Sequence, residues 1–180
     1  MSRHRRNQLQ RPQPVLGVDI GGVIVDRIAE NSDTSFFGDR PMDTPAVDGV
    51  FEALTQLGTV FEHRVHIISK AGPKIAALSR EWLRIHGVFE PPIDISESNV
   101  WFVNKRPDKA PICARLGVTH FVDDRPDVLQ HLANVPHRYL FIGGLGKHPQ
   151  PALSPTKMQR VSTWPELVIK IERTVRWMQT

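Results

Sequence analysis

The stretch VLGVDIGG at residues 15–22 begins with an apolar run that leads to a carboxylate, Asp19. In a second stretch, HFVDDR at residues 120–125, a short apolar run leads to Asp123 and Asp124. Short apolar runs of this kind are typical of strands buried inside a sheet. Because each run ends in aspartate, we expect acidic groups to meet at one edge of a sheet, where they could hold a divalent cation.

Further apolar runs recur along the chain and alternate with helical patterns. We expect strands at 15–19, 64–68, 99–103, 119–122 and 138–142, with helices between them. This alternation indicates βαβ units. The expected fold is therefore α/β: a three-layer, doubly wound, Rossmann-like core whose mainly parallel sheet has five or so strands and helices on both faces.

The 180 residues, 40% of them hydrophobic, suffice for one domain, which we place at 15–180. Residues 1–14 hold four arginines and no acidic residue, and we expect a disordered basic tail that could contact nucleic acid weakly. Residues 27–46 lack helical or strand periodicity and form the expected flap or lid. Residues 143–163 are irregular in the same way.

The composition also bears on location. No apolar stretch has the length or pattern of a signal peptide or a membrane span, so we expect no membrane partner. Cys113 is the only cysteine, which excludes an internal disulfide and fits a reducing, cytoplasmic location.

Polar residues follow the expected strands where a doubly wound sheet binds its ligands. Ser69 and Lys70 follow the strand at 64–68, and Lys109 lies in the first turn of a helix before the strand at 119–122. Carboxylates suit Mg²⁺, whereas a lysine and a hydroxyl suit phosphate oxygens. One carboxylate remains as a nucleophile for phosphoryl transfer.

These residues, in this order, resemble the haloacid dehalogenase superfamily, in particular capless or small-lid, phosphatase-like members with an Asp-x-Gly-Gly-Val first motif. The resemblance runs from about Val15 to the C-terminal helix. It implies a Mg²⁺-dependent phosphohydrolase that cleaves a phosphomonoester through an aspartyl-phosphate intermediate. Asp19 would be the nucleophile and a metal ligand, and Gly21 would offer its carbonyl to the metal. The remaining metal ligands would be Asp123 and Asp124.

The same resemblance implies a phosphate site. Its residues would be Gly22, Ser69, Lys70 and Lys109, and Lys109 would also serve catalysis. Lys105 is the competing candidate for this catalytic lysine, because it lies only four residues earlier.

Gly21 departs from the phosphatase pattern, in which this position is usually an aspartate that acts as general acid and base. Losing such a group typically costs about 10²- to 10⁴-fold in rate. One interpretation is an impaired pseudoenzyme that binds Mg²⁺, phosphate or a partner in a regulatory role. The other is a phosphatase whose proton comes from elsewhere, as in similar sugar-phosphate phosphatases, with Asp26 as a candidate.

The expected lid is short, so the site would be open. The phosphorylated substrate would then be a small molecule or an exposed phosphate on a macromolecule, or a homodimer would close the site. The run GVDIGG at 17–22 also resembles the phosphate-binding hairpin of sugar kinases, but that fold needs two related domains and a longer chain.

Overall fold

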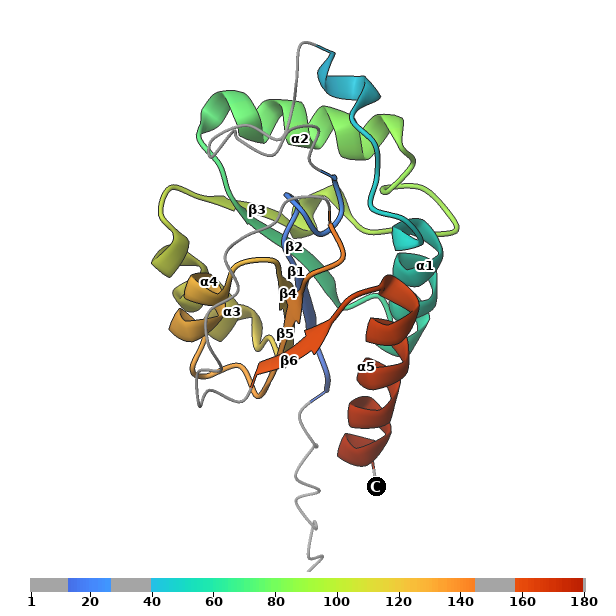
Figure 1. The fold of residues 1–180 in the computed structure, drawn as a ribbon, viewed down its shortest axis with the longest axis vertical. Coiled ribbons are helices and arrows are strands. Elements are labelled where there is room, and N and C mark those ends of the chain that lie inside the picture. Colours follow the sequence, from blue (N-terminus) through green and yellow to red (C-terminus); the bar gives the residue numbers. More distant parts are fainter. Residues whose placement is uncertain (1–12, 27–39, 145–157, 180) are drawn as a thin grey trace, which may run out of the picture.

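The computed structural model describes residues 13–26, 40–144 and 158–179. At its centre is a six-stranded sheet in which every neighbouring pair is parallel (Figure 1). The strand order is β3-β2-β1-β4-β5-β6. The strands are β1 Leu16–Val18, β2 Val65–Lys70, β3 Val100–Val103, β4 His120–Asp123, β5 His137–Phe141 and β6 Met158–Val161. The expected α/β fold is confirmed.

Helices cover both faces of this sheet (Figure 1). One face packs against α1, α2 and α5, and the other against α3 and α4. Short 3-10 helices precede several of these elements. The helices are α1 Val50–Val60, α2 Pro73–Ile85, α3 Lys109–Leu116, α4 Pro126–His131 and α5 Trp164–Gln179, and the 3-10 turns are η1 Pro41–Asp43, η2 Glu97–Asn99 and η3 Arg106–Asp108.

Alternation along the strands divides the interior into two cores. Leu16 and Val18 of β1 pack under α1, α2 and α5, whereas Val15 belongs to the core under α3 and α4. Phe121 and Val122 of β4 divide in the same way. Side chains alternate between the faces of a strand, so the buried residues of each strand determine the direction of the aspartate side chain that follows them.

The strand β6 corrects the expectation that residues 143–163 are irregular throughout. It lies at the edge of the sheet, beside β5. Of its four residues, only Val161 is fully buried. A polar edge strand of this kind lacks the apolar run by which the other strands were identified.

Most of the expected lid lies outside the described residues, as do residues 1–12 of the expected tail, so both stay predictions. The described end of the lid region, residues 40–46, makes hydrogen-bonded contacts with the rest of the domain. The indole Nε1 of Trp82 donates to the carbonyl of Thr44 at 2.8 Å, and Ala46 bridges to Val25. Among the described residues, no helix is long and apolar enough to cross a membrane.

Gly143 lies where the backbone after β5 approaches the end of β6. A Cβ at this position would overlap the carbonyl oxygen of Ser162, which is backbone and cannot rotate away. We therefore expect Gly143→Ala to lower the free energy of unfolding by about 1–3 kcal/mol, measured by urea denaturation.

Gly58 offers the matched control, because a Cβ there would meet Ile93 O at an ordinary 3.6 Å inside helix α1. Gly58→Ala should stabilise the protein by up to about 1 kcal/mol through helix propensity. If both variants shifted the denaturation midpoint alike, the close approach at Gly143 would not be the cause.

His120 is a buried histidine that is neutral in the folded protein. It is fully buried, stacks on His137 with ring centroids 4.4 Å apart, and contacts a threonine hydroxyl with each ring nitrogen. A neutral ring can donate to one threonine and accept from the other. Burial, and secondarily the charge of His137, lowers the pKa of His120 to about 3.

This histidine should make the protein acid-sensitive. Because its pKa is lowered on folding, the unfolded chain binds more protons between pH 6.5 and 3, so stability is full above about pH 6.5 and falls as pH falls. The loss from this group should reach about 3 kcal/mol by pH 4. Urea denaturation of His120→Gln between pH 7 and 4 should show a shallower decline than wild type, whereas the exposed His131→Gln should follow wild type. Parallel slopes for all three proteins would contradict the assignment.

Candidate functional site

Three aspartates meet at the carboxyl ends of β1 and β4. The two strands are paired with Val18 opposite Val122, and the amide of Asp19 donates to the Val122 carbonyl at 3.0 Å. Asp123 ends β4 and Asp124 follows it. One carboxylate oxygen from each aspartate lies within 4.8 Å of the others, and all three side chains are buried. The expectation that acidic groups meet at one edge of the sheet is confirmed.

Lys109 lies among these carboxylates. It is the first residue of α3, and its side chain is 1% exposed. Its Nζ donates to Asp123 Oδ2 at 2.8 Å and lies 2.9 Å from Asp19 Oδ1. Lys105, the competing candidate, is exposed. Of these two candidates, Lys109 is therefore the one that the fold brings to the aspartates.

The cluster carries more negative charge than Lys109 balances. Burial alone would lower the pKa of Lys109, but the charges of Asp123 and Asp19 outweigh it and raise that pKa. Burial raises the pKa of Asp123 to about 8, with Lys109 opposing and the other two aspartates adding to the rise. When all three carboxylates are ionised, as metal binding requires, they and the Lys109 ammonium sum to −2 among the described residues, a charge that one divalent cation would neutralise.

The donor set fits Mg²⁺, since hard oxygen ligands are the ones this cation prefers. Asp19 Oδ1 is buried, and among the described residues it accepts no hydrogen bond of good geometry, although Lys109 Nζ lies 2.9 Å away as an ion-pair partner. Its polarity is therefore only partly compensated within the protein, as expected of an oxygen positioned for a cation.

Two neighbours of the cluster were not anticipated from the sequence. The backbone amide of Arg125 donates to Asp123 Oδ1 at 2.9 Å, so it holds that carboxylate by the oxygen that Lys109 does not contact. The ring of Phe121 lies 5.5 Å from Lys109 Nζ. A backbone donor cannot be recognised from residue type. Phe121 could have been, because it lies two residues before Asp123 in the same strand and therefore shares its face of the sheet.

Ser69 and Lys70 end β2, the neighbour of β1 on the other side from β4. Ser69 is buried and Lys70 is exposed. Both thus lie at the same edge of the sheet as Asp19. Their assignment to phosphate binding stays a prediction.

Gly21 and Gly22 form a tight turn after β1. The carbonyl of Ile20 accepts hydrogen bonds from the amides of three later residues in the turn, and Gly22 has a positive φ of 74°. The amide of Gly22 donates to Val25 O at 2.8 Å, so that donor is engaged within the turn. The metal role of Gly21 and the phosphate role of Gly22 both stay predictions.

Asp26 follows this turn and is partly buried. The loop after β5 lies close to it: a Cβ on Gly144 would be 2.8 Å from Gly22 O and 3.5 Å from Asp26 Oδ1. Only a residue without a side chain fits there without displacing the turn. The close contact therefore fixes the turn that carries Gly21 against the end of β5.

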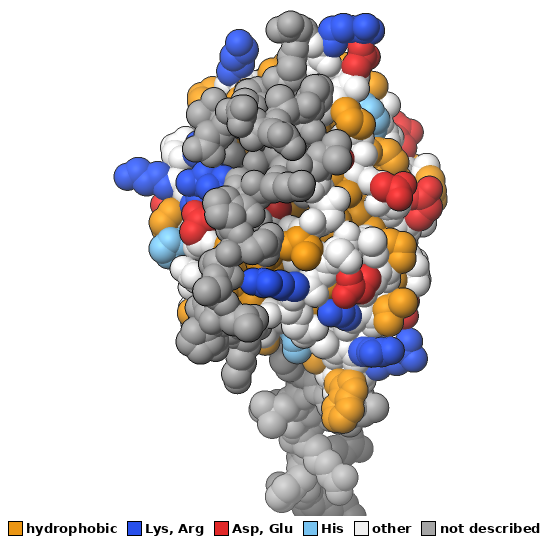
Figure 2. Space-filling model, in the orientation of Figure 1, with side chains coloured by type: hydrophobic (Ala, Val, Ile, Leu, Met, Phe, Trp, Pro, Cys, Tyr) orange, Lys and Arg blue, Asp and Glu red, His pale blue; other side chains and the backbone are white. Residues whose placement is uncertain are grey.

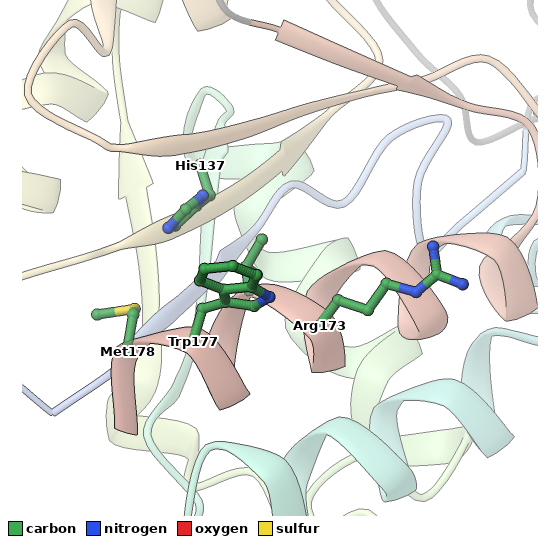
Figure 3. Close-up of a pocket in the computed structure, with 5 residues that line it drawn as sticks. His137, Arg173, Trp177 and Met178 are labelled. Atoms are coloured by element: carbon green, nitrogen blue, oxygen red, sulfur yellow. The ribbon is translucent and has the colours of Figure 1, made fainter. Parts of the chain in front are cut away.

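A separate hollow of about 390 Å³ lies at the opposite edge of the sheet (Figure 3). His137, the first residue of β5, forms one wall, and the α5 residues Arg173, Thr174, Trp177 and Met178 form the other. Since the aspartates lie at the carboxyl ends of the strands, this hollow is not part of the candidate site.

Comparison with known proteins supports this fold through a solved structure. No protein-family model and no curated protein matches the chain. Among solved structures, the chain is similar to a haloacid dehalogenase-like family hydrolase from Xanthomonas campestris. The TM-score is 0.58 at 11% sequence identity, over 94% of this chain and 99% of the other. At this identity the likeness shows a shared fold.

Proposed function

We propose that this protein is a Mg²⁺-dependent phosphohydrolase that acts on a phosphomonoester through a phosphorylated Asp19. The observation that carries the proposal is the contact of buried Lys109 with Asp19 and Asp123 at the carboxyl edge of the sheet. Burying a cation next to an apolar core costs free energy of folding, so such a residue is expected to pair with opposite charges or to serve a functional site. The same cluster offers the oxygen ligands for Mg²⁺.

The proposed chemistry has two steps. A carboxylate oxygen of Asp19 attacks the phosphorus, forming an acyl phosphate, and the bond from phosphorus to the ester oxygen breaks. Water then attacks the phosphorus, the bond to Asp19 breaks, and inorganic phosphate leaves. Lys109 holds Asp19 in place and offsets charge on the transferring group, and bound Mg²⁺ would supply further charge stabilisation.

The leaving oxygen needs a proton in the first step, and Gly21 has no side chain to give one. Asp26, close to the same turn, is one source, and solvent is the other. If neither served, the protein would be a pseudoenzyme that binds Mg²⁺ or phosphate in a regulatory role. Gly21 is the observation that favours this second candidate function.

A turnover assay decides between the two functions. The protein is incubated with a panel of phosphomonoesters, with Mg²⁺ or with EDTA, and free phosphate is measured. We expect release from at least one ester that stops in EDTA and returns when Mg²⁺ is restored. Absence of turnover across the panel would overturn the enzymatic proposal and favour the pseudoenzyme.

Metal binding can be tested without turnover. Mg²⁺ that binds the folded protein alone should raise the melting temperature, by more at higher Mg²⁺ concentration. Asp124→Asn removes one of the three candidate ligands and should shrink this shift, whereas the exposed Asp94→Asn should leave it as in wild type. An equal shift in all three proteins would place the metal elsewhere.

A further inference from the structure

Gly17 lies in the middle of β1, between Leu16 and Val18. In the sheet it is paired with Phe121 of β4. A Cβ on Gly17 would lie only 2.5 Å from Cδ2 and 2.7 Å from Cε2 of the Phe121 ring. Glycine inside a strand gives up side-chain packing and often marks a place where another group approaches the backbone closely. Gly17 therefore leaves the room in which the phenyl ring lies against β1.

This ring and the candidate site lie on the same face of the sheet. Gly17 stands two residues before Asp19, and Phe121 stands two residues before Asp123, so each pair shares a face. That face is the one covered by α3 and α4, because Phe121 belongs to the core beneath them. Lys109 reaches the aspartates from α3, and its Nζ lies over the Phe121 ring, 5.5 Å from the centroid. The ring is thus a direct neighbour of the cation that contacts both aspartates.

Lys109 differs from a surface cation in what surrounds its charge. Figure 2 shows lysine and arginine side chains that project from the surface, where water can hydrate them. The Lys109 side chain is 1% exposed, and Phe121 is fully buried. The negative face of an aromatic ring attracts a cation within about 6 Å, most strongly where water is excluded. The ring therefore supplies part of the attraction that water supplies to an exposed ammonium.

The ring also limits where the ammonium can lie. A lysine ammonium is a compact charge on a flexible four-carbon stem, so its position depends on the groups around it. Two carboxylate oxygens hold Nζ, at 2.8 Å from Asp123 and 2.9 Å from Asp19. Phe121 precedes Asp123 in β4, so its ring lies deeper in the sheet than these carboxylates. An aliphatic side chain could fill the same room but would not attract the cation.

We propose that Phe121, in the room that Gly17 leaves, is a positioning residue for Lys109. The face of its ring holds the ammonium beside Asp19 and thereby sets the direction of the carboxylate that attacks phosphorus. This inference rests on the proposed function. Because the ring is fully buried and does not reach the substrate, weakening it should lower kcat and leave KM nearly unchanged.

Fluorinated phenylalanines at position 121 test the attraction while keeping the packing. Fluorine changes the size of the ring little but weakens the negative charge of its face. The phosphomonoester of the panel with the highest kcat/KM serves as substrate. With one, two and three fluorines, kcat should fall stepwise to about 10-fold below wild type, while KM stays within about 2-fold. The same series at Phe141, a buried ring in the core on the other face of the sheet, should leave kcat unchanged.

Gly17→Ala tests the room for the ring. Its added methyl group would displace the ring, so kcat should fall by about 10-fold. Phe121→Val has no atoms at the δ and ε positions that this methyl group would overlap, and it should lower kcat by a similar factor. Adding Gly17→Ala to Phe121→Val should then cost little more, because the ring is already gone. Urea denaturation verifies that each variant is folded.

The two tests have separate consequences. A kcat that stays level across the fluorinated series at position 121 would overturn this inference and leave the phosphatase intact. Losses from Gly17→Ala and Phe121→Val that simply multiply in the double variant would do the same. Absence of turnover by the wild-type protein across the panel would overturn both this inference and the proposed function.

Discussion

Replacing Asp19 with asparagine should abolish phosphate release while leaving the fold intact. Asparagine has nearly the shape of aspartate but no charge, so it cannot form the acyl phosphate, and turnover should fall by at least about 10³-fold. With all its carboxylates ionised, the described cluster would pass from a net charge of −2 to −1, because one of its three carboxylates is replaced by a neutral amide. Without metal, the free energy of unfolding should therefore equal or exceed that of wild type.

The measurement combines a phosphate-release assay with urea denaturation in EDTA. Asp48→Asn is the control, since Asp48 is exposed and lies outside the cluster; it should match wild type in both. A soak or titration with beryllium fluoride, a mimic of the phosphoryl group on aspartate, should give binding in wild type and none in Asp19→Asn. Wild-type turnover in Asp19→Asn would exclude it as the nucleophile.

The meeting of the aspartates at one edge of the sheet was predictable, because it depends on residues within each strand. Each run ends in aspartate, and parallel strands that are neighbours in a sheet end on the same side. The pairing of β1 with β4 then brings Asp19 to Asp123. The sheet's last strand, β6, was missed because three of its four residues are partly or fully exposed and give no apolar signal.

The contacts of the cluster were less predictable, because they depend on how loops turn in space. Lys105 and Lys109 both precede β4 and lie four residues apart, and the 3-10 turn η3 between them decides which one is buried. The shared contact of Arg106 and Arg125 with Asp127 joins two loops that are about 20 residues apart. This contact follows from the packing of η3 against α4, and no pattern of residues in the sequence predicts it.

Replacing Lys109 with methionine should cause the largest loss of stability of any variant considered. Methionine fills a similar volume but removes the positive charge that contacts two of the three buried carboxylates, Asp19 and Asp123. Breaking a buried ion pair by removing one partner typically costs about 3–5 kcal/mol, since the other charges stay buried. Urea denaturation at pH 7 in EDTA should show a loss of that size, and phosphate release should be lost as well.

The pH dependence of this loss separates charge from packing. In Lys109→Met the buried carboxylates would hold protons more tightly than in the unfolded chain, so stability should rise as pH falls from 7 toward 4 relative to wild type. Mg²⁺ should restore part of the stability at pH 7, because it supplies the missing positive charge. The control Lys170→Met removes a partly exposed lysine 3.1 Å from Glu166, and should cost at most about 1 kcal/mol at any pH. If Lys109→Met cost no more than this control, or if its loss did not change with pH, Lys109 would be a packed side chain and not the counter-charge that holds the site together.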